Sequence, residues 1–134
     1  MERLALVASG VLGFLAVALG AFGAHGLKSR LGPLADGAAR LEWWSTGAHH
    51  HLVHAVALAV VGYLAGRSGS STAVVVAAGA FVFGILLFSG SLYAMALTGT
   101  RALGMITPLG GLGFLVGWAA VAIAAWSLPA SPKP

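Results

Sequence analysis

The chain alternates long apolar blocks with short polar segments. Apolar stretches run over about residues 4–24, 72–97 and 102–126, and a shorter one covers about 48–65. Each is a continuous block rather than a stripe at helical spacing, which is the pattern of a helix surrounded by lipid. About 20 helical residues cross a hydrocarbon core of about 30 Å. The pattern therefore predicts an all-α fold, an integral membrane four-helix bundle, as a single membrane domain over residues 1–134.

The first block has a second interpretation, as a cleaved signal peptide. Glu2 and Arg3 precede it, and small residues between Ala21 and Ala24 resemble a cleavage site. The apolar region of a signal peptide is usually only about 7 to 15 residues long, which is shorter than this block. We therefore expect the block to be retained as the first spanning helix.

The polar segment from Lys28 to Trp44 has a pattern of its own. Apolar residues recur in it three or four positions apart, at Leu31, Leu34, Ala38 and Leu41. This spacing predicts a short interfacial amphipathic helix between the first two spanning helices, opened by Pro33 at a first-turn position. An ordinary polar loop is the alternative.

Short links join the remaining blocks. Residues 66–71 read as a flexible turn, and residues 98–101 are so few that the last two helices must form an antiparallel hairpin. The proline-rich tail, 127–134, is predicted to be frayed. Four crossings put both termini on one side of the membrane. The basic residues divide evenly between the two sides, so charge alone does not choose the orientation.

Composition supports the membrane assignment and excludes several classes of site. Only 7% of the residues are charged and 59% are hydrophobic, whereas soluble domains are about 25% charged. The absence of cysteine excludes disulfides, thiolate metal sites, cysteine nucleophiles and palmitoylation. The net charge is +4, but the basic residues are scattered between the apolar blocks, so no nucleic-acid partner is expected.

Small residues at four-residue spacing predict how the helices pack. Lipid gives apolar helices no hydrophobic incentive to associate, so close backbone approach has to hold them together. We expect membrane lipids to surround the bundle. Packing of these small residues inside one bundle is the preferred interpretation, and an interface between copies of the chain in a homo-oligomer is the alternative. The residues concerned are Ser9 with Gly13, then Ala16, Gly20 and Ala24, then Ala80 with Gly84, and Gly113 with Gly117.

The alternating helix directions bring most polar side chains toward one membrane face. The opposite half of the predicted bundle is almost entirely apolar, so any polar chemistry is confined to one end. We predict that the histidines of the second helix lie at or just below the membrane surface. The candidate ligand-binding residues are His25, His54, Ser89, Ser91, Tyr93 and Thr107.

A metal or haem site is the alternative use of the histidines. His54 is four residues after His50 and three after His51, so it can share a helix face with either, and His25 could add a ligand from the neighbouring helix. Apart from Glu42, however, no carboxylate is near to complete a shell. Interfacial histidines more often hydrogen-bond to backbone, Ser or Tyr groups, so we expect no cofactor.

The sequence argues against ion conduction and against catalysis. The spans contain no charged residue, and a polar path that stops halfway across a membrane conducts nothing. Ser89 and Ser91 have no carboxylate nearby to complete a catalytic triad. We therefore expect a non-enzymatic membrane component that binds a lipid headgroup, a small ligand or a partner protein at its polar end. A metal, haem or small-solute binding or transport protein is the alternative.

Four segments carry a family resemblance. They are GAFGAHG at 20–26, the stretch 44–58, LFSGSLY at 87–93, and TPLGG at 107–111 followed by Gly117 and Trp118. With them the sequence resembles the small bacterial inner-membrane proteins called domain of unknown function 423, whose eukaryotic relatives are called transmembrane protein 256. The resemblance covers nearly the whole chain. It implies a four-helix membrane fold, no established activity, and both termini in the cytoplasm.

The chain departs from the family at one place. Relatives typically show a Tyr-Gln pair where this sequence has His50 and His51, so the four-histidine cluster is a feature of this chain. The resemblance implies that any shared function rests on the residues that match the family pattern, which are His25, His54, Ser89, Ser91, Tyr93, Thr107 and Pro108.

Overall fold

The computed structural model describes residues 1–128, which are helical apart from short turns. Its elements are α1 (Glu2–Phe22), η1 (Gly23–Leu27), α2 (Lys28–Leu31), α3 (Gly37–Ser68), α4 (Thr72–Gly84), η2 (Ile85–Ser89), α5 (Gly90–Thr98), η3 (Arg101–Met105) and α6 (Thr107–Trp126). η1 and η2 are π-helical turns and η3 is a 3₁₀ turn. Most of the tail that is predicted to be frayed lies outside the described residues.

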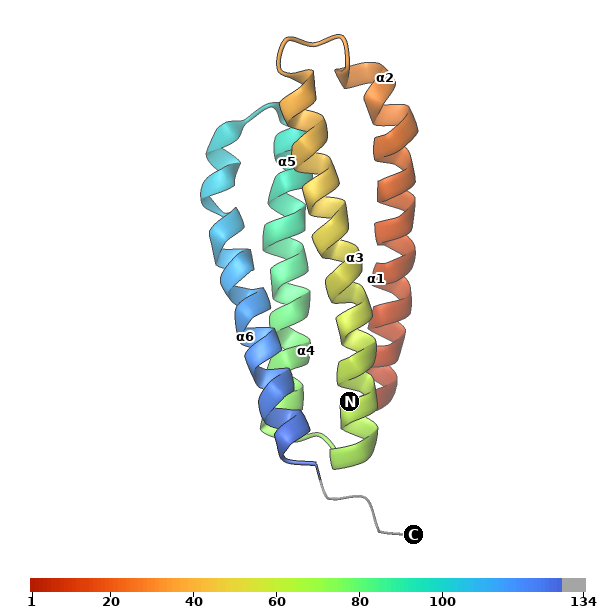
Figure 1. Cartoon of the computed structure of the whole chain (residues 1–134), viewed down its shortest axis with the longest axis vertical. Coiled ribbons are helices and arrows are strands. Elements are labelled where there is room, and N and C mark those ends of the chain that lie inside the picture. The colour runs from red at the N-terminus through yellow and green to blue at the C-terminus, as the bar shows by residue number, and fades with distance from the viewer. Residues whose placement is uncertain (129–134) are drawn as a thin grey trace.

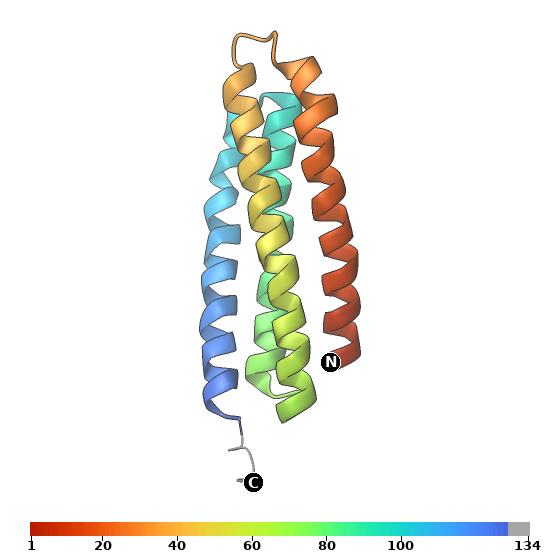
Figure 2. The same cartoon turned by 45° about the vertical axis from the view of Figure 1, so that its right-hand side comes forward.

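These elements join into four spanning segments, residues 2–31, 37–68, 72–98 and 101–126, each long and apolar enough to cross a membrane. They run alternately up and down, as Figure 1 shows, so the start of α1 and the end of α6 lie at the same end of the bundle. The first spanning segment, residues 2–31, stands at the edge of the bundle and packs mainly on α3 (Figure 2). α4 packs mainly on α6. The predicted four-helix membrane bundle is confirmed.

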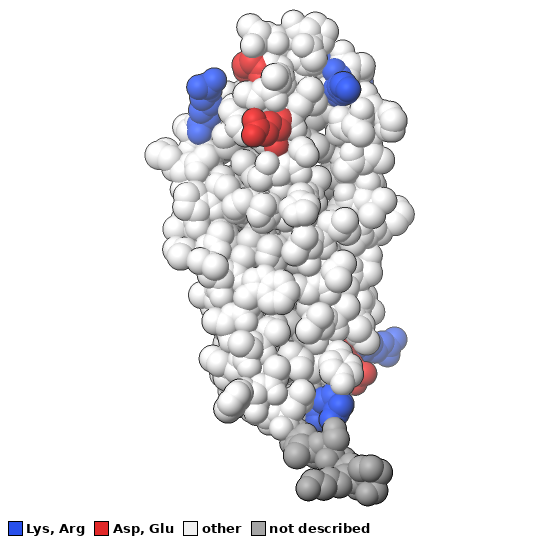
Figure 3. Space-filling model, viewed as in Figure 1, with Lys and Arg blue, Asp and Glu red and all other residues white. Residues whose placement is uncertain are grey.

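Charged residues form one band at each end of the molecule and leave an uncharged belt between them (Figure 3). On α3 the belt extends from Glu42 to Arg67, which corresponds to about 37 Å of helix. Large apolar side chains face outward in the belt, among them Phe14, which is 74% exposed. Such a surface is stable only in contact with lipid.

The predicted interfacial helix between the first two spans is wrong. Residues 28–31 continue the first spanning segment through η1, and α3 already begins at Gly37, so Pro33 lies in a turn. Within the predicted apolar stripe, Leu31 is buried and Leu41 packs against the cluster of Leu27, Leu31, Trp44 and Ala96. Leu34 and Ala38 are exposed, so the four residues do not form one continuous face. The second span is therefore much longer than the predicted 48–65.

Local signals end the other helices. Ser71 accepts a hydrogen bond from the backbone N–H of Val74 at 3.4 Å and so caps the start of α4. Gly99 ends α5 with a φ of +74°, a left-handed conformation that glycine adopts readily. These signals explain why the prediction of 72–97 for the third span is close to the observed 72–98.

The small residues predicted to mediate packing are used unequally. Between α4 and α6, a Cβ added at Gly117 would lie 2.5 Å from the ring of Phe81, and one at Gly84 would overlap Phe114. This pair therefore packs closely inside the bundle. On α1, a Cβ at Gly13 or Gly20 would meet nothing within 4 Å in the described part of the chain.

Candidate functional site

His54 lies near the middle of the uncharged belt between the two charged bands. It is 12 residues after Glu42 and 13 before Arg67, so about 18 to 20 Å of helix separate it from either charge. The prediction that the histidines of this helix lie at or just below the membrane surface is therefore wrong for His54. The reason is that α3 begins at Gly37, well before the apolar block at about residues 48–65.

Two hydrogen bonds fix the imidazole of His54. Its Nδ1 is 2.7 Å from the carbonyl oxygen of His50, and the indole N–H of Trp118 donates to its Nε2 at 3.2 Å. A carbonyl only accepts, so Nδ1 carries the proton, and Nε2 is the acceptor of a neutral ring. The ring also stacks on Phe114, with centroids 3.5 Å apart and planes inclined by 6°. His54 thus joins α3 to α6.

This arrangement does not assemble the predicted metal set of His25, His50, His51 and His54. Neither ring nitrogen of His54 has a free lone pair, and His25 is exposed on η1. Over residues 1–128 there is no group of three or more His, Asp or Glu side chains that could hold a metal ion. No observation therefore favours the metal or haem alternative.

The other predicted site residues form separate contacts between helices. The Tyr93 hydroxyl is 3.3 Å from Nδ1 of His51, which links α5 to α3. Ser91 and Thr107 lie 2.8 Å apart through their hydroxyls and link α5 to α6. Ser89 is fully buried in η2. The Tyr93–His51 and Ser91–Thr107 pairs thus join helices, whereas the buried Ser89 hydroxyl has no hydrogen-bond partner among residues 1–128.

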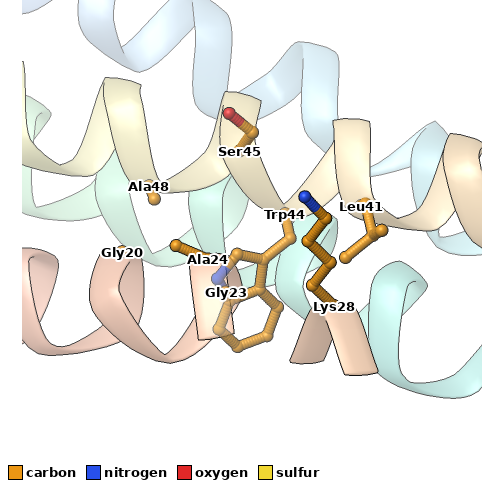
Figure 4. Close-up of a pocket in the computed structure, with 8 residues that line it drawn as sticks. All are labelled: Gly20, Gly23, Ala24, Lys28, Leu41, Trp44, Ser45 and Ala48. Carbon is orange, nitrogen blue, oxygen red and sulfur yellow. The ribbon is translucent and has the colours of Figure 1, made fainter. Parts of the chain in front are cut away.

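A cleft opens between the first spanning segment and α3, with a volume of about 320 Å³ (Figure 4). Among the described residues that line it, Lys28 alone is charged. Glycine, alanine and other apolar groups make up most of the remaining lining, so the walls of the cleft are mostly apolar. The lining residues are Gly20, Gly23, Ala24, Lys28, Leu41, Trp44, Ser45 and Ala48.

Trp44 and the π-helical turn η1 shape one wall of the cleft. The indole reaches from α3 to the first spanning segment (Figure 4), where its N–H donates to the carbonyl oxygen of Leu19 at 2.9 Å. It lies so close to Gly23 that a Cβ there would overlap the ring. The indole also packs on Tyr93, with centroids 4.6 Å apart. Glycine at 23 is therefore required for this close approach.

The cleft runs from the charged band into the apolar belt. Lys28 belongs to the band, whereas Gly20 lies eight residues earlier, about 12 Å deeper. On the facing helix, Ala48 lies six residues beyond Glu42, about 9 Å deeper. In Figure 4 the amino group of Lys28 turns toward α3. The ammonium group of Lys28 thus lies at the opening of a cleft that is otherwise lined by uncharged residues.

The candidate residues chosen from sequence do not line this cleft, and Lys28 and Trp44 were missed as site residues. A signal was present, because GAFGAHG supplies Gly20, Gly23 and Ala24, and Trp44 opens the second family segment. The contact of Trp44 with Gly23 was not foreseen because residues 28–44 were predicted to form an interfacial helix.

Comparison with known proteins agrees with the resemblance. A family model described as "Protein of unknown function (DUF423)" matches residues 19–111. The chain is similar to the UPF0382 membrane protein YwdK of Bacillus subtilis, with 41% identity over 90% of this chain and 94% of the relative. It is also similar to the UPF0382 inner membrane protein YgdD of Escherichia coli, with 36% identity over 92% of this chain and 90% of the relative.

The matched range includes both π-helical turns, Trp44 and His54. None of the solved structures matches the chain. Because the family model covers more than half of the chain and the relatives cover nearly all of it, the chain belongs to the DUF423 family of membrane proteins of unknown function.

Proposed function

We propose that the protein is a non-enzymatic membrane component that binds a phospholipid in the cleft between the first spanning segment and α3. The headgroup lies beside Lys28 and an acyl chain extends past Ala24 and Ala48 toward Gly20. The observation that carries this proposal is the cleft's direction, from a charged mouth in the headgroup region to an apolar interior. A phospholipid has the same order of polarity along its length.

The walls of the cleft suit an acyl chain. A Cβ at Gly20 would meet nothing within 4 Å in the described part of the chain, so protein side chains do not fill the space there. The indole N–H of Trp44 is already bonded to Leu19, which leaves an apolar ring surface. In Figure 4 the Ser45 hydroxyl turns away from α1. An apolar chain in the cleft therefore buries no unpaired polar group.

Filling the cleft tests the proposal. Gly20→Leu adds a side chain to the cleft, and Gly13→Leu is the matched control, because it lies on the same helix, has equal space for a Cβ, and does not line the cleft. Both are made in a variant whose only tryptophan is Trp44, with phenylalanine at the other three tryptophans. Quenching of Trp44 fluorescence by phosphatidylcholine with brominated acyl chains then reports lipid in the cleft.

We expect strong quenching of Trp44 fluorescence in the variant with Trp44 as its only tryptophan and in its Gly13→Leu derivative. Quenching should be clearly weaker in the Gly20→Leu derivative. Helix content from circular dichroism confirms that each variant is folded. Equal quenching in the two leucine variants would show that lipid does not enter the cleft and would overturn the proposal.

We also propose that both termini lie in the cytoplasm, in accordance with the family resemblance. The start of α1 and the end of α6 share one end of the bundle, and the cleft opens near the other end. This orientation places the bound phospholipid in the outer leaflet of a bacterial inner membrane.

A further inference from the structure

We infer that the cleft selects phospholipids with an anionic headgroup and that Lys28 is the residue that confers this selectivity. The inference rests on the proposed function, because it concerns the headgroup of the same bound lipid. It assigns to one side chain a preference that the apolar walls of the cleft cannot provide.

Lys28 has no salt-bridge partner in the part of the chain that the structure describes. Lys28 is exposed, and the ion pair found in residues 1–128 joins Arg40 to Asp36 instead, at 3.9 Å. Glu42 is exposed on α3, beyond salt-bridge distance of Lys28. The aliphatic stem of a lysine can lie along an apolar wall while its ammonium group stays in the headgroup layer. A lipid phosphate beside Lys28 is therefore placed to supply the missing negative charge.

The other basic residues at this end either contact groups outside the cleft or do not line it. Arg40 donates to the carbonyl oxygens of Ala96 and Leu97 at 2.7 and 2.6 Å. Arg101 lies over the ring of Trp43, 5.9 Å from its centroid. Arg30 is exposed on α2 and does not line the cleft. Lys28 alone joins the cleft to the charged band.

The absence of acidic residues among those that line the cleft decides against zwitterionic headgroups. Choline and ethanolamine headgroups carry a cation next to their phosphate. In this cleft that cation would face Lys28 and find no carboxylate partner on the walls. A headgroup with a phosphate and no cation, such as phosphatidylglycerol, meets no like charge.

Two brominated lipids test the selectivity. In the variant with Trp44 as its only tryptophan, quenching is titrated with brominated phosphatidylglycerol or brominated phosphatidylcholine in vesicles of phosphatidylcholine. One lysine near an anionic lipid changes relative affinity by about five-fold. We therefore expect phosphatidylglycerol to be preferred by about that factor, less so at high salt. Lys28→Gln should abolish the preference and Lys28→Arg should retain it.

Arg30→Gln is the matched control, because it removes a charge from the same short helix outside the cleft and should keep the preference. The inference is overturned if the lipids quench equally, if Lys28→Gln leaves the preference intact, or if Arg30→Gln removes as much of it as Lys28→Gln. In each case sensitivity to Gly20→Leu still supports a lipid-filled cleft. If Gly20→Leu has no effect with either lipid, the proposed function itself fails.

Discussion

At the scale of single residues, His54 shows how an imidazole is held at the centre of a membrane with no charged partner. A buried polar group without a hydrogen bond destabilises a fold by about 1 to 3 kcal/mol. Both nitrogens of His54 are bonded, one within α3 and one to Trp118, and the ring face is covered by Phe114. His54 lies in the segment 44–58 that carries the family resemblance, but its hydrogen-bond partner on α6 is 64 residues away in the chain.

The bond between His54 and Trp118 should contribute measurably to stability. Trp118→Phe removes the donor to Nε2, and His54→Phe removes the acceptor. Hydrogen bonds between membrane helices are worth about 0.6 kcal/mol on average and up to about 1.7. We expect a coupling free energy in this range from a double-mutant cycle of unfolding in mixed detergent and denaturant.

Trp126→Phe serves as the control for loss of an indole, because Trp126 is 92% exposed. It should change the free energy of unfolding little. Zero coupling between positions 54 and 118 would contradict the assigned hydrogen bond.

At the scale of elements, the two π-helical turns coincide with two of the segments that carry the family resemblance. η1 lies within GAFGAHG and η2 overlaps LFSGSLY. A glycine permits close packing at each turn. Gly23 of η1 lets the indole of Trp44 approach, and Gly110 of α6 lets that helix approach the backbone of Phe88 in η2. Apolar periodicity does not distinguish a π-turn from an α-helix, so the sequence pattern did not predict either one.

The close approach of α6 to η2 predicts a strong effect at Gly110. A Cβ there would lie 2.8 Å from the backbone Cα of Phe88, an atom that cannot move alone. Gly110→Ala should therefore lower the free energy of unfolding by about 1 to 3 kcal/mol or prevent folding. Gly90→Ala is the matched control, because its Cβ would meet nothing within 4 Å in the described residues. A larger loss at Gly90 than at Gly110 would contradict this packing.

Arg40 provides a second test at this scale, because it caps the end of α5 from another helix. Its Nε and Nη2 bond two carbonyls that lack partners within α5. Arg40→Lys keeps the charge but cannot donate with the same fork, so we expect faster amide hydrogen exchange at the end of α5. Arg30→Lys, which alters an exposed arginine, should leave that exchange unchanged.

At the scale of the whole molecule, α3 is the centre of the bundle and the first spanning segment is attached to it at the edge. Two buried clusters hold the molecule. One surrounds Val61, Val74 and Phe81 in the half near the termini, and the other surrounds Trp44 at the opposite end. The cleft lies beside the second cluster, where the first spanning segment contacts α3.

The topology predicts opposite labelling of the two ends. The chain has no cysteine, so single variants can be labelled with a membrane-impermeant maleimide and the unmodified chain is the blank. Pro33→Cys and Thr100→Cys lie in turns at one end, and Ser70→Cys lies in a turn at the other. With cytoplasmic termini, the first two should label in intact cells and Ser70→Cys only after permeabilisation.

Different labelling of Pro33→Cys and Thr100→Cys would contradict four crossings. The reverse pattern at all three sites would contradict the cytoplasmic orientation alone and would place the cleft in the inner leaflet.

Local composition by itself determined the membrane location, the four crossings and the common side of the termini, because the transfer of an apolar block into lipid depends on that block alone. The tertiary structure decided what the polar residues do. The depth of His54 depends on where α3 begins, and the cleft depends on Trp44 meeting Gly23 across a turn. Such contacts join residues far apart in the chain, so they follow from packing and cannot be read from local periodicity.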